Sequence, residues 1–242
     1  MIQLFLKEVN GFLDSLIAYI VIGTFLTGIG LLMWVFPDTS VLEYGYADMT
    51  TLFSLGPYVF MFLIPAITMR LLSEEQKTGT LELLLTRPLT DFQVIMAKYL
   101  AGFFLVIFSI LPTLVYYYSI SQLGNPPGNL DSAGIFGSYI GLVLLGGVFT
   151  SIGIFASSLT ENQIVSFILA VFLCFIFFSG FDNLSSLEIW GDKALTIAQL
   201  GILYHYDAMS RGLIDSRDLI YFIGVICIMI LSTKLRMESR KW

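Results

Sequence analysis

Long apolar runs separated by short polar segments dominate the pattern of this chain. Six of the runs are long enough to cross the hydrocarbon core of a bilayer, which takes about 17 to 25 helical residues. The sequence therefore predicts an all-α membrane protein, with the whole of residues 1–242 forming one transmembrane domain. The six membrane-spanning helices are expected over about residues 16–36, 52–72, 94–123, 135–159, 164–181 and 219–235.

Composition supports a chain embedded in the lipid bilayer. Of its 242 residues, 57% are hydrophobic and only 12% are charged, and the mean hydropathy is +0.85. Ordinary globular domains carry about 25% charged residues, so a water-soluble fold of this size would lack polar surface. The net charge of -6, without a concentrated basic patch, excludes nucleic acid as a partner.

The basic residues predict the orientation of the chain. Nine lie on the side that holds both termini, and only Lys193, Arg211 and Arg217 lie on the other. The positive-inside rule then places both termini in the cytoplasm of a multi-pass protein of the inner (cytoplasmic) membrane. The nine are Lys7, Arg70, Lys77, Arg87, Lys98, Lys234, Arg236, Arg240 and Lys241.

The most polar segment on the cytoplasmic side is residues 74–88, here named the coupling segment. The helix before it is expected to continue through Lys77, and Gly79 can take the left-handed conformation that ends a helix. Thr80 would begin a short helix that Pro88 ends. Its apolar face would hold Leu81, Leu84 and Leu85, with Glu82 beside them. The alternative is an ordinary polar loop.

The connection between the fifth and sixth spans, residues 182–218, is too long for a plain loop. Within it, residues 195–203 are as apolar as a span but too short to cross the membrane. We expect a re-entrant or interfacial helical element on the outer side. The lone histidine, His205, is expected to be a hydrogen-bonded interfacial residue rather than a metal ligand or a catalytic base.

Chemistry that would power or catalyse a reaction is missing from the sequence. There is no G-x-x-x-x-G-K-[ST] phosphate-binding pattern, so energy from ATP must come from another subunit. No paired histidines or nucleophile motif is present, and we expect no cofactor, no metal and no enzymatic activity. Every charged residue can be placed near the end of a span, which disfavours a transporter driven by protons or sodium ions.

Three stretches carry a resemblance to a known family: residues 74–88 followed by Ala97-Lys98-Tyr99-Leu100-Ala101, residues 211–219, and the tail 236–242. They resemble the ABC type-2 exporter permeases, and in detail the permease subunit associated with gliding motility. The resemblance implies that the coupling segment is a cytoplasmic coupling helix that docks on an ABC ATPase subunit. It also implies a second permease copy or a related permease. The docking candidates are Glu75, Gly79, Thr80, Leu81, Glu82, Leu84, Leu85, Arg87 and Pro88.

The sequence leaves three functions open. The chain could serve gliding motility or an associated secretion system, or it could export a drug, lipid, polysaccharide or metal-maturation factor. It could also be a membrane scaffold that transports nothing and passes the work of an ATPase to a partner complex. The apolar spans offer no polar constellation from which to choose a cargo.

Overall fold

The computed structural model describes residues 1–43, 45, 47–80, 90–212 and 214–239, and in these residues the chain is helical with no strand. By length and composition, five helical segments in this part of the chain could cross a membrane, and a bent helix pair at the N-terminus makes a possible sixth. This confirms the prediction of an all-α protein with about six spans. The five segments are Thr50–Lys77, Asp91–Leu123, Ser132–Leu159, Gln163–Ser185 and Ser216–Glu238.

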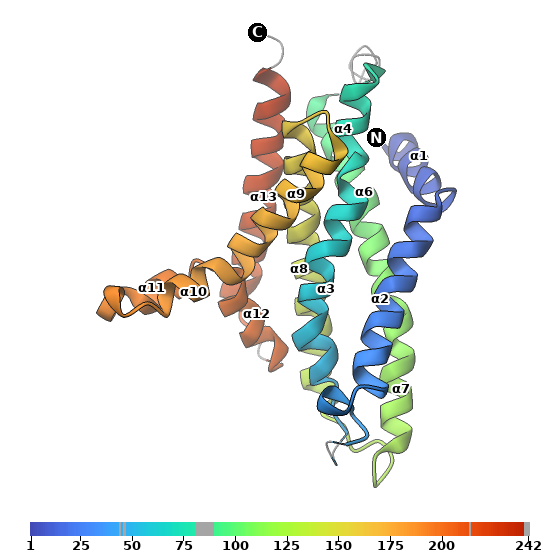
Figure 1. The fold of residues 1–242 in the computed structure, drawn as a ribbon, viewed down its shortest axis with the longest axis vertical. Coiled ribbons are helices and arrows are strands. Elements are labelled where there is room, and N and C mark those ends of the chain that lie inside the picture. The colour runs from blue at the N-terminus through green and yellow to red at the C-terminus, as the bar shows by residue number, and fades with distance from the viewer. Residues whose placement is uncertain (44, 46, 81–89, 213, 240–242) are drawn as a thin grey trace.

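The bent pair consists of α1 (Ile2–Leu13) and α2 (Leu16–Trp34), which meet at an angle of 65°. Helix α1 is amphipathic, and its apolar side buries Leu4, Val9 and Phe12. This side packs on α6 (Asp91–Ile110), while α2 runs down the bundle beside α3 (Figure 1).

The second span is divided into α3 (Thr50–Thr68) and α4 (Arg70–Lys77). A proline in the middle of a helix removes one backbone hydrogen bond and favours a kink, but Pro65 lies inside α3. The division falls one turn later, at Met69, where the backbone N–H donates to the Pro65 carbonyl at 2.8 Å.

The third span is divided at a proline. Helix α6 opens on a capping box in which Thr90 and Gln93 exchange hydrogen bonds, and it ends at Ile110. Leu111–Thr113 then form a 3₁₀ turn that contains Pro112, and α7 (Leu114–Leu123) continues the span. A proline has no N–H to donate, so the regular α-helical ladder stops there.

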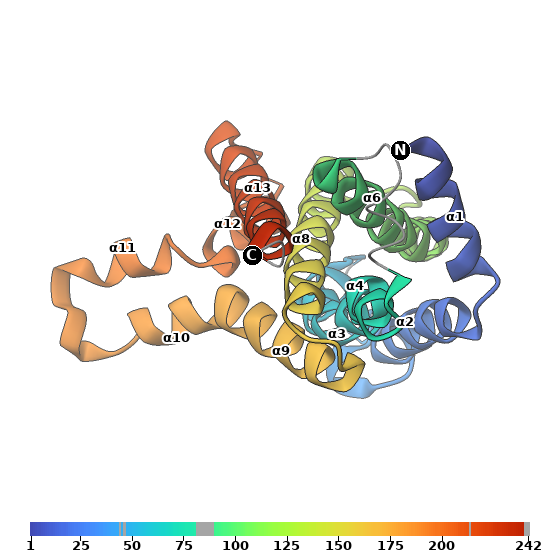
Figure 2. The same cartoon turned by 90° about the horizontal axis from the view of Figure 1, so that it is seen from above.

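Helix α8 (Ser132–Leu159) is the centre of the bundle, and 78% of its most apolar window is buried. Figure 2 shows it between α13 (Ser216–Glu238) on one side and α4 and α6 on the other. Small residues make this possible. A Cβ atom at Gly153 would strike the Thr68 side chain of α3, so only glycine permits this approach.

The fifth span leaves the bundle at its end. Helix α9 (Gln163–Phe175) passes through a π-helical turn at Ile176–Gly180 into α10 (Phe181–Ser185). A 3₁₀ segment, Glu188–Lys193, and α11 (Ala194–Ala198) complete residues 181–198, the lateral arm, which projects sideways from the bundle (Figures 1 and 2). Helix α12 (Ile202–Ser210) then returns to pack on α8. The re-entrant or interfacial assignment of residues 182–218 stays a prediction.

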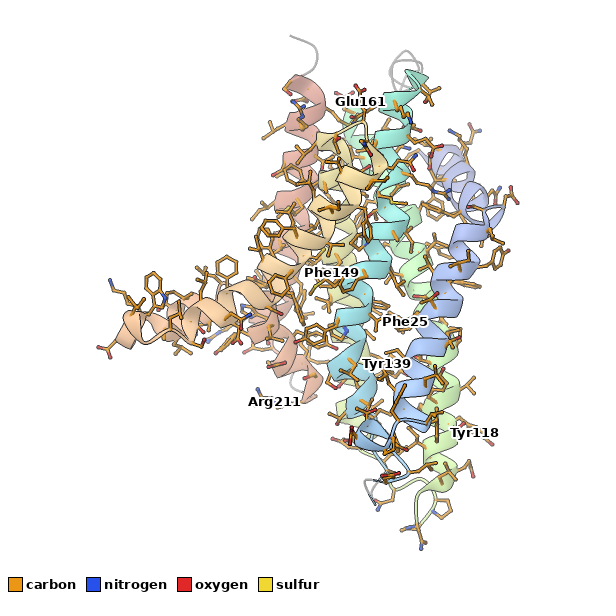
Figure 3. The ribbon with its side chains drawn as sticks, viewed as in Figure 1. Phe25, Tyr118, Tyr139, Phe149, Glu161 and Arg211 are labelled. Atoms are coloured by element: carbon orange, nitrogen blue, oxygen red, sulfur yellow. The ribbon has the colours of Figure 1, made fainter. Side chains whose placement is uncertain are left out.

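The start of α1, the end of α13 and the whole of α4 lie at one end of the bundle, here named the termini-bearing end (Figure 1). The end of α7 and the C-terminal part of α12 lie toward the opposite end. Figure 3 labels Glu161 at the first end and Arg211 toward the second.

Candidate functional site

Helix α4 carries the start of the coupling segment at the termini-bearing end of the bundle (Figure 1). It ends at Lys77, where the Thr78 N–H donates to the Glu74 carbonyl at 3.0 Å. Gly79 follows with a φ of 69°, which confirms the predicted left-handed end, and a side chain there would be strained. Thr80 is exposed, and its hydroxyl lies 2.9 Å from that of Thr78.

The other docking candidates, Leu81, Glu82, Leu84, Leu85, Arg87 and Pro88, lie outside the described residues. Their assignment stays a prediction. The described residues show how α4, which begins the coupling segment, is held against its neighbouring helices.

The first support is a hydrogen-bonded joint between α4 and the end of α8. The Ser157 hydroxyl accepts the backbone N–H groups of Leu72 and Ser73, both at 3.0 Å, and donates to the Met69 carbonyl at 2.9 Å. These groups belong to the division between α3 and α4, so the serine ties the interrupted backbone to the central helix. The Gln76 amide adds a bond to the Ser158 carbonyl at 3.2 Å.

The second support is a buried charged cluster. The Lys98 side chain is 1% exposed, and its Nζ lies 3.0 Å from Glu8 Oε1 and 2.8 Å from Glu75 Oε1. The three residues come from α6, α1 and α4, so one ammonium joins three helices. A buried ion pair of this kind is costly to break, because removing one partner leaves an uncompensated charge.

Glu75 therefore faces inward. We predicted it as a docking residue, but its side chain is only 14% exposed, and one carboxylate oxygen is committed to Lys98. Its other oxygen, Oε2, is buried and accepts no hydrogen bond from the described residues. Glu75 thus connects α4 to α6 through an ion pair. Its contact with an ATPase subunit stays a prediction.

A charged cleft of about 490 Å³ separates α1 from α4, and Lys98 lies at its wall. Arg70 crosses the cleft, donating to the Ser15 hydroxyl at 3.3 Å and lying over the Phe12 ring at 5.0 Å. Three acidic and three basic side chains line the cleft, so its formal charges balance. They are Glu8, Glu74, Glu75, Lys7, Arg70 and Lys98.

The comparison with known families decides the assignment. Residues 39–200, about two thirds of the chain, match the family model described as ABC-2 family transporter protein. The chain belongs to the ABC-2 transporter family. No curated protein matches the chain.

Membership of the ABC-2 family makes the chain a multi-pass component of a membrane transporter, and the family as a whole works with ABC ATPase subunits. The matched range contains the coupling segment, Ser157 and Lys98. It does not contain α1, so Glu8 lies outside the part that the family model describes.

The opposite end of this ABC-2 chain holds a second polar cluster, around a cavity of about 840 Å³. His205 Nδ1 lies 2.6 Å from Asp218 Oδ1, its Nε2 lies 2.9 Å from the Gln199 carbonyl, and its ring stacks on Tyr221 with centroids 3.9 Å apart. The prediction that His205 is a hydrogen-bonded residue is confirmed. The two ring nitrogens thus connect α12 to the first turn of α13 and to the segment before α12.

Asp207 lines the same cavity. Loss of solvent raises the pKa of its carboxyl above 3.8, the nearby Arg211 opposes the rise, and the charge of Asp182 adds to it. At the rim, Asp215 caps α13 by accepting the Arg217 N–H at 3.0 Å, and this bond lowers the pKa of that carboxyl.

Sequence reasoning missed that Lys98 is buried and that Glu8 is its partner. We placed Lys98 among ordinary charges near the end of a span, but residues 94–101 are otherwise apolar. A lysine inside such a run indicates a partner from another helix. The partner could not be chosen from sequence, because Glu8 lies 90 residues earlier.

Proposed function

We propose that this chain is the membrane-spanning permease subunit of an ABC exporter, driven by a separate ATPase subunit that docks on the coupling segment. The observation that carries the proposal is that α4, which begins this segment, is tied to α8 by the Ser157 hydrogen bonds and to α1 and α6 by the Lys98 cluster, in a chain of the ABC-2 family. A polar loop with no partner would not need these contacts. A helix that transmits movement from an ATPase to the spans does need them.

The proposal includes an orientation and an assembly. Both termini and the coupling segment lie in the cytoplasm, where the ATPase has access, and the excess of basic residues on that side supports this. The membrane is the inner (cytoplasmic) membrane. A second permease copy, or a related permease, completes the pathway, because the described residues of one chain hold only five or six candidate spans.

Among the functions open to the family, we propose that the ATPase serves gliding motility. The support is the resemblance of residues 74–88, 211–219 and 236–242 to the permeases of that system. Export of a drug, lipid, polysaccharide or metal-maturation factor is the alternative, and a scaffold without cargo is the third. Uptake of candidate cargo into reconstituted inside-out vesicles separates the first two from the third.

Co-purification with matched variants tests the docking proposal. Gly79→Val places a β-branched residue at a φ of 69°, so the coupling segment should be displaced. The ATPase subunit, detected by its ATP hydrolysis, should then no longer co-purify with the permease. Leu84→Asp with Leu85→Asp should have the same effect, because it removes the apolar contact surface proposed for the ATPase.

Gly79→Asn is the matched control, since asparagine tolerates the left-handed conformation, and it should retain the ATPase. Glu161→Ala, in an exposed turn at the same end, should also retain it. If the valine and aspartate variants bind the ATPase as well as the unchanged protein does, the docking proposal is wrong.

A further inference from the structure

The buried cluster around Lys98 joins α1, α4 and α6 at the wall of the charged cleft. Helix α1 packs on α6 through Leu4, Val94 and Ala97, and it shares an apolar cluster with α4 that includes Phe12 and Leu71. Across the cleft the polar links are Glu8–Lys98–Glu75 and, about two turns away, Arg70 with Ser15 and Phe12. The charged cluster is the one of these links that places a buried ion pair between α1 and α4.

From these contacts we infer that Lys98 and Glu8 are positioning residues that make α1 move together with α4. The inference rests on the proposed function for the source of movement, and goes beyond it by adding a second path. Movement of the coupling segment reaches α3 through the chain itself and reaches α1 through the charged cluster. This path ends in α1, an amphipathic helix whose one face packs on the bundle and whose other face is exposed.

The burial of the cluster makes it a fixed link rather than a surface ion pair. Exposed pairs exchange with water and ions and contribute little, whereas a lysine that is 1% exposed has no solvent to replace a lost carboxylate. The two glutamates share one ammonium. When α4 moves, Lys98 must follow or lose Glu75, and Glu8 must follow Lys98.

Distances between spin labels on the permease alone, in lipid nanodiscs, test the link without any ATPase. The labels replace the exposed Asn10 on α1 and Lys77 on α4, in a Cys227→Ser background, because Cys174 is buried. The unchanged cluster should give one narrow distance distribution. Glu8→Gln should broaden it at least twofold, because Lys98 then holds only Glu75.

Three further variants make that result specific. Lys98→Met should broaden the distribution as Glu8→Gln does, and Lys98→Arg should restore it, because a guanidinium can pair with both carboxylates. Glu74→Gln changes the exposed neighbour of Glu75 and should leave the distribution narrow. If Glu8→Gln, which keeps the Lys98–Glu75 pair and so should fold, leaves the distribution as narrow as in the unchanged protein, the link is refuted.

The complex with the co-purified ATPase, trapped with ATP and vanadate, tests the second path. A label at Glu161, in the turn between α8 and α9, serves as the reference point. In the unchanged complex both Lys77 and Asn10 should shift relative to Glu161 when nucleotide is trapped. With Glu8→Gln, the Lys77 shift should remain and the Asn10 shift should fall by at least half.

The two proposals fail in different ways in this experiment. If no ATPase is bound, or Lys77 does not shift in the unchanged complex, the proposed function fails, and the nanodisc distances still decide the link. If Lys77 shifts and Asn10 does not, or if Asn10 still follows Lys77 fully in Glu8→Gln, the inference about α1 is refuted while the docking proposal stands.

Discussion

The two ends of the bundle use polar side chains in contrasting ways. At the termini-bearing end, Lys98 is buried between two carboxylates and joins three helices. At the opposite end, His205 joins α12 to α13 at the side of an open cavity of about 840 Å³. The polar link at the first end is closed off from solvent and joins three helices, whereas the link at the second end joins two helices beside an open cavity.

Burial also differs between the helices of the bundle. Helix α8, which anchors α4 through Ser157, has 78% of its apolar window buried, while the corresponding windows of the fifth span and of α13 are 28% buried. The lateral arm exposes large apolar side chains, including Ile189 at 84%. A rigid element that receives movement and a loosely packed element that can respond to it are what a coupled transporter needs.

The largest expected loss of stability comes from removing the ammonium group of the buried cluster. Lys98→Met leaves Glu8 and Glu75 as uncompensated buried carboxylates, which should cost about 3–5 kcal/mol of unfolding free energy. Thermal unfolding in detergent measures this loss. Lys234→Met is the matched control, because Lys234 pairs with Glu238 at 3.5 Å on the exposed surface and should contribute less than about 1 kcal/mol. Equal losses of unfolding free energy for the two lysine variants would show that the buried cluster holds the helices no more strongly than an exposed ion pair does.

The next largest effect should come from Ser157. Ser157→Ala leaves the N–H groups of Leu72 and Ser73 without their acceptor, at an expected cost of about 1–3 kcal/mol. Ser151→Ala in the same helix is the control, since the Ser151 hydroxyl bonds to the carbonyl of Val148 within α8. Hydrogen exchange should quicken in residues 69–77 for the first variant and stay unchanged there for the second. No change for either would mean that the joint does not hold α4.

At the opposite end, His205→Gln should act locally. A glutamine loses the stacking on Tyr221 and cannot span both Asp218 and the Gln199 carbonyl. We expect amide exchange in residues 199–210 to rise severalfold, while exchange in α4 is unaffected. Tyr221→Phe keeps the stacked ring and loses the 2.6 Å bond to the Leu200 carbonyl, so its effect should be smaller. A rise in α4 exchange in His205→Gln would contradict the independence of the two ends.

The smallest effect concerns pH. Because burial raises the pKa of Asp207 in the folded chain, the native state holds this proton more tightly than the unfolded chain does. The contribution of Asp207 to stability therefore falls as the pH rises from about 4 through the raised pKa. Asp207→Asn should remove that loss, so its melting temperature relative to the unchanged protein should increase between pH 4 and pH 7. A constant difference over this range would show that Asp207 does not titrate abnormally.

Much of the fold could be predicted because long helices are encoded by their own residues. Apolar runs located the spans at about the positions that the structure gives them. Gly79 was predicted as a left-handed end because few other residues accept that conformation. These features depend on neighbours in sequence, which one chain displays directly.

The features that were missed depend on neighbours in space. The division at Met69 follows from Ser157, which lies 88 residues away, and the inward turn of Glu75 follows from Lys98. The lateral arm could be placed between two spans but not given a direction, since large apolar side chains along it, such as Leu184, Ile189 and Leu195, stay exposed. A sequence pattern shows that a charge needs a partner, but the fold decides which one it finds.

Photo-cross-linking in living cells tests the central claim most directly. A benzoylphenylalanine at the exposed Thr80, next to Gly79, should cross-link to an ABC ATPase subunit, identified by mass spectrometry from its phosphate-binding loop. The same amino acid at the exposed Glu43, on the other side of the predicted membrane, should not. If Thr80 captures no ATPase, or if a membrane-impermeant reagent added outside intact cells labels a cysteine at Thr80, the coupling segment does not receive force from an ATPase in the cytoplasm.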